Sequence, residues 1–266
     1  HKSVDKQIHI FNKNDFSYLT SMGNFGEGPE EITVMGCLAI DEAHHQLYVS
    51  DHAKQKIFSY DMDSVMVDSL YKPQVKTAMN ETLFPSEYQY INDTLSIAVL
   101  IKPTSTSTFN QFLGRWNMNT GEMIPMKYTH PDIQKKRITF AASEKAGIYV
   151  ECYTRHDLMT ICSLDGELLY NIYGPDWDGG NGNKLQSFGT VMIGNDKIFV
   201  SYCGEDYARD SFPTKILVFD LEGNYLKTLE TGYKISDCCY DSFNNRIILS
   251  LNDVVQFAYL DIDGII

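Results

Sequence analysis

Short apolar runs separated by polar turns recur along the whole chain. One kind of run is a three-residue apolar strand that begins at Leu47, Leu95, Ile148, Ile198 and Ile247. These starts lie 48, 53, 50 and 49 residues apart. No helical period of any length accompanies them, so the pattern predicts β-strands. Asn, Asp, Lys or Gly before most copies predicts a tight turn in front of each strand.

A second pattern follows each copy: an apolar strand that ends in a turn rich in Asp, Asn and Gly. Copies of this strand end and turn lie at residues 60–64, 116–121, 162–166, 219–223 and 260–264, with a sixth copy at residues 11–15. Such residues adopt positive φ or bond their own backbone, which suits tight hairpins. In the fourth repeat the two patterns predict four strands, at residues 138–142, 148–153, 158–163 and 167–172.

The regular period predicts the fold. Four short antiparallel strands in each 48–53 residues are typical of a β-propeller blade. A two-sheet sandwich would not explain that period. We therefore predict an all-β chain that forms a single β-propeller domain over residues 1–266, with four-stranded antiparallel blades. Six copies of the second pattern favour six blades, the first incomplete in this chain. Five blades with an extra N-terminal hairpin are the alternative.

Charge and composition narrow the class of partner. The chain carries 22 Lys and Arg against 35 Asp and Glu, a net charge of −13. Such a protein repels phosphate backbones, so we expect no nucleic-acid partner. No apolar run reaches the roughly 18 residues of a membrane span, so we expect no transmembrane segment.

The six cysteines do not form a recognisable framework. None of them makes a C-x-x-C motif, which argues against a zinc knuckle or a thioredoxin-like site. Cys152 and Cys162 flank a predicted hairpin, and the sequence leaves open whether they form a disulfide. The neighbouring Cys238 and Cys239 are expected to point to opposite faces of a strand.

The connections between predicted strands differ in length. Five are long, at residues 24–35, 72–85, 103–111, 175–186 and 204–214. In a propeller, the loops between the second and third strands and the links between blades share one face. Because rigid scaffolds tend to carry function on long loops, we predict binding at this long-loop face and at the mouth of the central channel.

Eight residues on the predicted long-loop face are the candidate binding residues. They are Asp51, His52, Arg155, His156, Trp177, Glu205, Tyr207 and Arg209. Tyr207 and Arg209 belong to the most charged long loop and are plausible anchors for a partner. A His beside a carboxylate can act in acid–base catalysis, but adjacent turn residues usually point apart. We therefore assign no catalytic residue and no metal ligand.

The stretch "GNFGEGPEEI" at residues 23–32 carries a resemblance to a known family. It lacks the Lys-Ser/Thr and the helix of a phosphate-binding loop. Its Gly26–Glu31 part resembles the G-x-G-P-G-E link of TolB-like and NHL-like six-bladed propellers, with Glu30 where that family usually has Gly. The hairpin "IHIFNKNDFSYLTSMG" and the later "LYVSDHAKQKIFSYD" are also similar to that family's blades.

The resemblance implies a protein outside the cytoplasm, since these propellers are common among secreted bacterial lipoproteins. It implies an export signal and a lipid anchor upstream of residue 1, with a location in the periplasm or at the outer membrane or cell surface. It brings no catalytic residue, because most of the family lacks an assigned activity.

Three functions follow from these observations. We favour a non-enzymatic binding propeller that engages a protein, a peptide or a glycan, with no cofactor. One alternative is a metal-dependent hydrolase or lyase of the lactonase type, which would hold a divalent cation in the central channel. The other is a structural subunit of an envelope complex. The sequence therefore leaves catalysis open while favouring binding.

Overall fold

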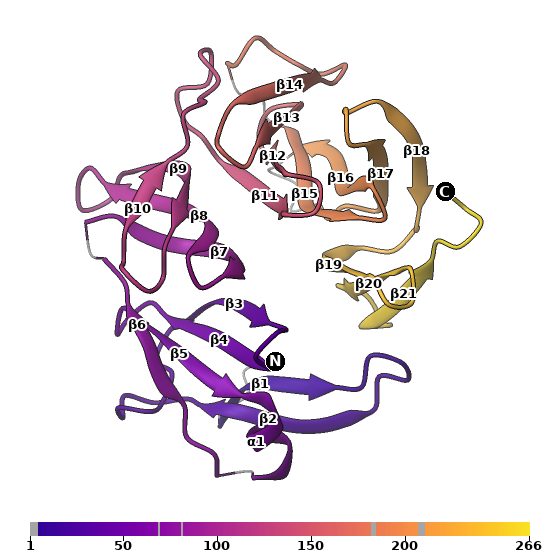
Figure 1. Cartoon of the computed structure of the whole chain (residues 1–266). Helices are drawn as coiled ribbons and strands as arrows, with labels where there is room; N and C mark the ends of the chain where they lie inside the picture. Colours follow the sequence, from indigo (N-terminus) through magenta and orange to yellow (C-terminus); the bar gives the residue numbers. More distant parts are fainter. Residues whose placement is uncertain (1–4, 69, 81, 182–184, 207–210) are drawn as a thin grey trace. The chain divides into compact units, whose positions relative to one another are not determined.

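The computed structural model describes residues 5–68, 70–80, 82–181, 185–206 and 211–266. The chain divides into two compact units, residues 1–125 and 126–266. Among the described residues, six antiparallel sheets form, and the strands of each sheet pair in chain order (Figure 1). The assignment of both units to one domain stays a prediction.

The first unit contains three sheets. The first is the hairpin of β1 (Lys6–Phe11) and β2 (Tyr18–Asn24). The second comprises β3 (Met35–Asp41), β4 (Gln46–Asp51), β5 (Lys56–Asp61) and β6 (Gln74–Ala78). The third comprises β7 (Phe84–Asn92), β8 (Leu95–Pro103), β9 (Phe109–Trp116) and β10 (Met123–Pro125).

The second unit also contains three sheets. The fourth sheet comprises β11 (Ile138–Ser143), β12 (Ile148–Tyr153), β13 (Leu158–Ser163) and β14 (Leu168–Tyr173). The fifth comprises β15 (Leu185–Gly194), β16 (Lys197–Asp206), β17 (Lys215–Asp220) and β18 (Tyr225–Glu230). The last comprises β19 (Ile235–Asp241), β20 (Arg246–Leu251) and β21 (Phe257–Asp261). In the fourth sheet every predicted strand boundary is correct to within one residue.

Polar turn residues explain why the repeats fold alike. In the turn after β3, the Asp41 carboxylate accepts the backbone N–H of His44 and lies 2.8 Å from the ring Nδ1 of the same residue. At the matching place after β19, Asp241 accepts the Nε–H of Arg246 at 3.1 Å. Each turn ends in a left-handed residue, with φ of 53° at His45 and 47° at Asn245. The Asp/Asn/His pattern therefore closes each hairpin locally.

The core lies between neighbouring sheets. All six residues of β12 are buried, and Val150 of this strand packs in one cluster with Phe188 of the next sheet. Val218 and Leu249 belong to a cluster that joins the fifth sheet to the last, and similar clusters join the sheets of the first unit. The first strands β11 and β15, and β15 and β19, also contact each other. Sheets stacked in chain order with adjacent inner strands form a β-propeller, as predicted.

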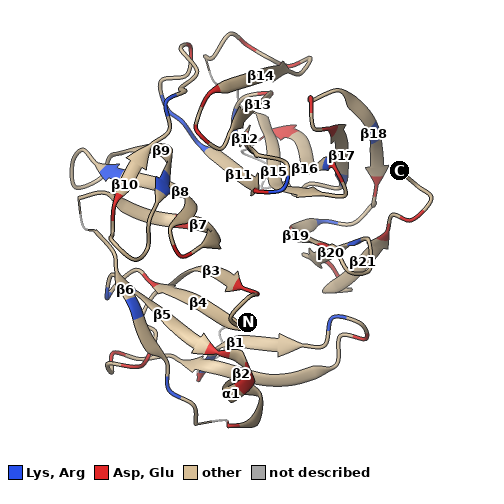
Figure 2. Ribbon diagram, in the orientation of Figure 1, with Lys and Arg blue, Asp and Glu red and all other residues tan. Residues whose placement is uncertain are grey.

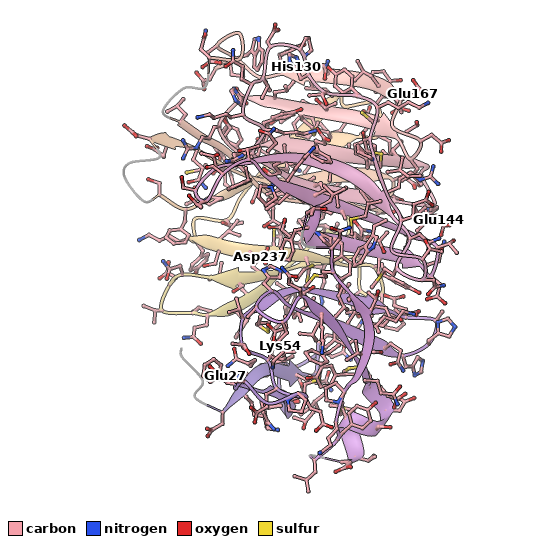
Figure 3. All side chains as sticks on the ribbon, turned by 90° about the vertical axis from the view of Figure 1, so that its left-hand side faces the viewer. Glu27, Lys54, His130, Glu144, Glu167 and Asp237 are labelled. Atoms are coloured by element: carbon pink, nitrogen blue, oxygen red, sulfur yellow. The ribbon has the colours of Figure 1, made fainter. Side chains whose placement is uncertain are left out.

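In the second unit the links between sheets and the short turns within sheets lie at opposite ends of the strands. Figure 3 shows His130, from the link before β11, at one end of the strands, and Glu144 and Glu167, from the short turns, at the other. The turn between β12 and β13 lies at the same end as the links, because it follows β12. The long-loop face of this unit is therefore a real structural feature.

Several local expectations were wrong. A short helix, α1 (Met62–Val67), follows β5, and the Asp61 carboxylate caps it by accepting the Ser64 N–H at 2.7 Å. The predicted loop at 72–85 contains β6, and the one at 103–111 is shortened because β8 and β9 extend into it. Within the described residues, no helix is long or apolar enough to cross a membrane.

The cysteines are all free thiols. Cys152 pairs across the sheet with Met159, and Cys162 pairs with Tyr149, so the two thiols do not face each other. Cys238 is buried and Cys239 exposed, as expected for neighbours in a strand.

Candidate functional site

A polar pocket opens on the long-loop face of the second unit. Its volume is about 570 Å³, within the usual range for ligand pockets. It is lined by Asp132, Gln134, Lys135, Arg137, Arg155, His156, Gly180 and Asn181. Three of these side chains are cationic and one is a carboxylate, in a chain with a net charge of −13. We call it the basic pocket.

Three segments build the basic pocket, and hydrogen bonds hold them together. They are the link before β11, the turn between β12 and β13, and the loop after β14. Thr154 of the turn donates its N–H to the carbonyl of Arg137 at 3.0 Å. Asp157 of the turn accepts the N–H of Asp176, in the loop, at 3.0 Å. The pocket walls are thus joined by hydrogen bonds from backbone N–H groups, one to a backbone carbonyl and one to the Asp157 carboxylate.

Three consecutive cations, Lys135, Lys136 and Arg137, enter β11, where Figure 2 shows a blue segment. Side chains alternate along an extended chain, so the middle one points away from its neighbours. Lys136 is buried and its Nζ lies 2.6 Å from the carboxylate of buried Glu151. Tyr153 donates its hydroxyl to the same carboxylate at 3.1 Å. Lys135 and Arg137 line the pocket, and the Arg137 guanidinium also donates to the carbonyl of Lys136 at 2.7 Å.

An aromatic cluster supports the floor of the basic pocket. Trp177 packs against Tyr173, His130 and His156, with ring centroids 5.0, 5.4 and 6.1 Å away. His130 Nε2 lies 3.0 Å from the Tyr173 hydroxyl. Burial lowers the pKa of both His130 and His156, so both rings are neutral near pH 7. Trp177 therefore packs behind the pocket and holds His156 in place.

Two buried polar atoms in these segments lack a hydrogen-bond partner among the described residues. They are Nδ1 of the lining residue His156 and Oδ2 of Asp178, in the loop after β14. His156 Nδ1 lies 3.9 Å from Asp178 Oδ1, which is too long for a direct hydrogen bond. His156 is only 6% exposed, so the cost of an unmet polar atom is substantial there. Such atoms are typical of sites that a ligand or a water completes.

Glycines let the pocket segments approach each other closely. Gly180 has φ of +83°, and a Cβ at this position would lie 2.5 Å from the carbonyl oxygen of Asp132. A Cβ at Gly174 would lie 2.1 Å from the carboxylate of Asp157. Burial raises the pKa of Asp157, although the Asp176 N–H opposes the change. The glycines of this loop are therefore required by packing against the turn and the link.

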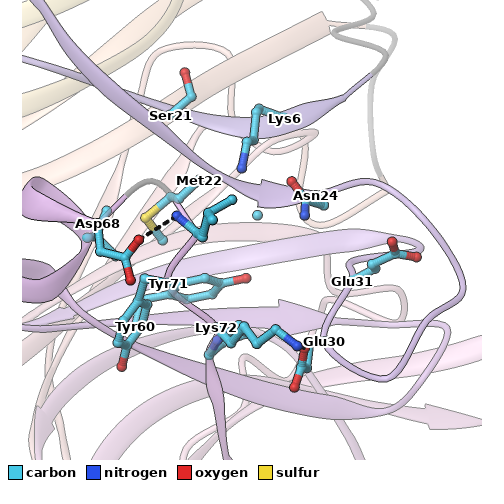
Figure 4. Close-up of a pocket in the computed structure, with 14 residues that line it drawn as sticks. Lys6, Ser21, Met22, Asn24, Glu30, Glu31, Tyr60, Asp68, Tyr71 and Lys72 are labelled. Atoms are coloured by element: carbon cyan, nitrogen blue, oxygen red, sulfur yellow. Dashed lines mark hydrogen bonds and ion pairs between the residues drawn. The ribbon is translucent and has the colours of Figure 1, made fainter.

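A second pocket lies in the first unit, beside the 23–32 segment (Figure 4). Its volume is about 480 Å³. Its charges are mixed and partly neutralise each other, since Lys72 lies 2.8 Å from Glu30, and Glu31 accepts the Gly28 N–H at 2.8 Å. The hydroxyl of Tyr60 is buried there without a hydrogen-bond partner among the described residues, and burial raises the pKa of Tyr60 to about 12. The basic pocket has a clear excess of one charge, which this pocket lacks.

Asp51 lies beside that segment of the first unit and is fully buried. Its carboxylate accepts four backbone N–H groups, from Thr33, Val34, Ala53 and Lys54. Burial alone would raise the pKa of Asp51, but these donors outweigh it and lower the pKa. The Lys54 Nζ in turn donates to the carbonyl of Gly28 at 2.8 Å and to that of Glu31. Asp51 and Lys54 thus hold the glycine-rich link in shape.

His52 contacts the next sheet. Its ring lies edge-on to Phe84 with centroids 4.8 Å apart, and burial lowers the pKa of His52. The ring also covers Gly36, where a Cβ would lie 2.0 Å from its Nε2. Asp51 and His52 belong to the first unit and all the residues that line the basic pocket belong to the second. These two candidates are therefore not among the residues of the basic pocket.

Of the remaining candidates, Arg155 and His156 line the basic pocket and Trp177 packs behind it. Glu205 is exposed near the end of β16, paired with Gln186. Tyr207 and Arg209 lie outside the described residues. Sequence reasoning missed Lys135 and Arg137, although three consecutive cations in an acidic chain were a visible signal. The binding role of all eight candidates stays a prediction.

No group of three or more His, Cys, Asp or Glu side chains is arranged to hold a metal ion in the part of the chain that the structure describes.

Comparison with known proteins shows the fold. Residues 2–115 match the model of the DUF5128 family, which is described as a 6-bladed beta-propeller. No curated protein matches the sequence. The description of that family names six blades, and the described residues of this chain form five sheets of three or four strands together with the β1–β2 hairpin.

Three solved structures are similar at low identity. A member of the duf4221 family from Bacteroides vulgatus has a TM-score of 0.64 and 9% identity, over 95% of this chain and 86% of that one. A protein of unknown function from Bacteroides caccae has a TM-score of 0.56 and 13% identity, over 98% of this chain and 87% of that one. A structure described as the extracellular domain of a one-component system from B. thetaiotaomicron has a TM-score of 0.55 and 14% identity, over 87% of this chain. This chain spans 28% of that last protein.

Proposed function

We propose that this protein is a non-enzymatic binding propeller that recognises an anionic group on a protein, peptide or glycan. The observation that carries the proposal is the basic pocket, where Lys135, Arg137 and Arg155 line one concavity. The lining has three cationic side chains and one carboxylate, so its charge favours an anion over a cation. The planar guanidinium of Arg suits bidentate recognition of a carboxylate, sulfate or phosphate.

Local geometry suits a fixed rather than an adaptive site. Lys135 and Arg137 flank the buried Lys136–Glu151 anchor, and Arg155 belongs to a turn held by backbone hydrogen bonds. Preorganised side chains lose less entropy when a ligand binds. The floor residue His156 adds a polar contact from a buried position.

We place the protein outside the cytoplasm, in the periplasm or at the cell surface, exported and lipid-anchored. The support is its resemblance to TolB-like and NHL-like propellers and its similarity in fold to a protein described as an extracellular domain. Cell fractionation of the native producer, probed with an antibody, tests this placement; recovery in the cytoplasm would contradict it.

Binding can be tested with the purified chain on an array of carboxylated and sulfated glycans and acidic peptides, followed by calorimetry with the best probe. The variants are Arg155→Ala and Lys135→Ala. The matched control is Lys145→Ala, since Lys145 is 82% exposed and pairs with Asp196 in the short turns. We expect the first two to weaken binding about 10-fold or more, as for charge-assisted hydrogen bonds worth roughly 1.5–3 kcal/mol.

The control variant is expected to bind like the wild type. The proposal fails when no anionic probe binds, or when the pocket variants bind as tightly as Lys145→Ala.

A further inference from the structure

A hydroxyl-lined pocket lies next to the basic pocket in the second unit. Its volume is about 470 Å³, and the described residues that line it include no charged side chain. Six hydroxyl side chains do: Thr139, Thr154, Thr190, Ser201, Ser211 and Ser236. Half-buried Phe212 adds an apolar surface. We call it the hydroxyl pocket.

The two pockets share a wall. Arg137 lines the basic pocket and Thr139, two residues further on, lines the hydroxyl pocket. Thr154 and Arg155 are neighbours in the same turn and line the hydroxyl and basic pockets respectively. The Thr154 N–H and hydroxyl both contact the carbonyl of Arg137, at 3.0 and 3.4 Å. A ligand of moderate length can therefore contact both pockets at once.

The hydroxyl pocket offers hydrogen-bond acceptors to a ligand. Thr139 donates its one hydroxyl proton to the carbonyl of Gly189, and Thr190 donates its proton to Asp237 at 2.7 Å. A hydroxyl that has donated its proton keeps its lone pairs, so it accepts from a ligand. The preferred occupant is a neutral group rich in O–H donors, with a C–H face that can cover Phe212.

We propose that the ligand is an acidic oligosaccharide, with a uronic-acid carboxylate in the basic pocket and a neighbouring sugar in the hydroxyl pocket. The inference rests on the proposed function and adds the class of ligand. An acidic peptide would satisfy the basic pocket, but it brings only one backbone N–H donor per residue to the acceptors Thr139 and Thr190 of the hydroxyl pocket. A sugar instead brings several hydroxyl donors at once.

The test compares four probes by calorimetry: trigalacturonic acid, galacturonic acid, triglutamate and a neutral trisaccharide, maltotriose. The variants are Ser236→Ala and Thr190→Val, with Ser242→Ala as the matched control. Ser236 and Ser242 are both exposed in the last sheet, but Ser242 lies in the turn after β19, away from the pocket lining. Thermal unfolding of each variant shows that it is folded.

We expect trigalacturonic acid to bind more tightly than galacturonic acid and triglutamate. Ser236→Ala and Thr190→Val should each weaken trigalacturonic acid roughly 2- to 12-fold, the loss of one hydrogen bond, and leave galacturonic acid unchanged. Equal binding of triglutamate and trigalacturonic acid, both lost in Arg155→Ala, would overturn the saccharide inference and leave the proposed function intact. Unchanged trigalacturonic acid binding in both hydroxyl variants would do the same. Binding of every probe unaffected by Arg155→Ala would overturn both proposals.

Discussion

The buried ion pair beneath the basic pocket allows a quantitative test of how the site is held. Lys136 and Glu151 side chains are 6% and 1% exposed, and the Lys136 Nζ lies 2.6 Å from each carboxylate oxygen. Tyr153 donates to the same carboxylate. The perturbation is Glu151→Leu, which removes the negative charge while keeping most of the side-chain volume.

The expected loss in the free energy of unfolding comes from the two groups that Glu151→Leu leaves without their partner, the Lys136 ammonium and the Tyr153 hydroxyl. Removing one partner of a buried pair leaves an uncompensated charge, which costs about 3–5 kcal/mol. The hydroxyl of Tyr153 also loses its acceptor, which costs about 1–3 kcal/mol. The double variant Lys136→Met/Glu151→Leu removes both charges, so its free energy of unfolding is expected within about 2 kcal/mol of the wild type. The double variant is therefore expected to be more stable than Glu151→Leu by about 2 kcal/mol or more, although Tyr153 lacks its acceptor in both variants.

Urea unfolding followed by tryptophan fluorescence and far-UV circular dichroism measures these free energies. Lys145→Ala is the control, because its pair with Asp196 is exposed and worth less than about 1 kcal/mol. Should Glu151→Leu prove too unstable to purify, the double variant still tests the reasoning. The reasoning is refuted when Glu151→Leu costs no more than Lys145→Ala, or when the double variant is as unstable as the single one.

Further predictions concern pH and backbone geometry. The pKa of Asp51 lies below its unfolded value of 3.8, so its carboxylate stabilises the fold above that pH and the contribution is lost as pH falls through the folded pKa. Asp51→Asn is therefore expected to be less stable than the wild type at pH 7. The difference between their urea midpoints should narrow as the pH falls into the acid range, and a difference that stays constant with pH would contradict this. The pKa of His156 lies below 6.5, so stability falls as pH drops from 6.5 through the folded pKa, and His156→Phe should flatten the decline between pH 7 and 5. If stability falls with pH as steeply in His156→Phe as in the wild type, the His156 ring is not buried in its neutral form. Gly180→Ala should weaken anion binding, because its Cβ would meet Asp132, whereas Gly179→Ala, also at positive φ but with open space around it, should bind nearly as the wild type. Equal effects on calorimetric affinity would refute the packing argument.

The alternation of apolar and polar residues was sufficient to place most strands. The fourth repeat shows this best, because β11 to β14 match the predicted strands within one residue. Helix α1 was missed because six residues are too few to show a helical period, and its stability depends on the cap from Asp61. β6 was missed because its sequence, Gln74–Ala78, has few apolar residues and pairs at the outside of the sheet.

The candidate site was predicted less completely. Arg155 and His156 were found because they follow a buried strand in a predicted turn, and turn residues there face the long-loop end. Asp51 occupies a similar turn, yet its carboxylate is used by N–H groups from Thr33 and Val34, which come from the preceding link. The turn pattern is the same in both places, so it does not distinguish a side chain that binds from one that supports a loop.

The sequence by itself determined the repeat, the strands and turns, and hence the propeller, because these depend on the period of neighbouring residues and on local backbone preferences. Tertiary structure alone decided which of three consecutive cations is buried, since Glu151 lies 15 residues from Lys136 in the chain. It also decided that Trp177 supports His156 rather than standing exposed. These outcomes depend on contacts between segments distant in sequence, where burial and charge compensation set the free energy, and no local pattern records them.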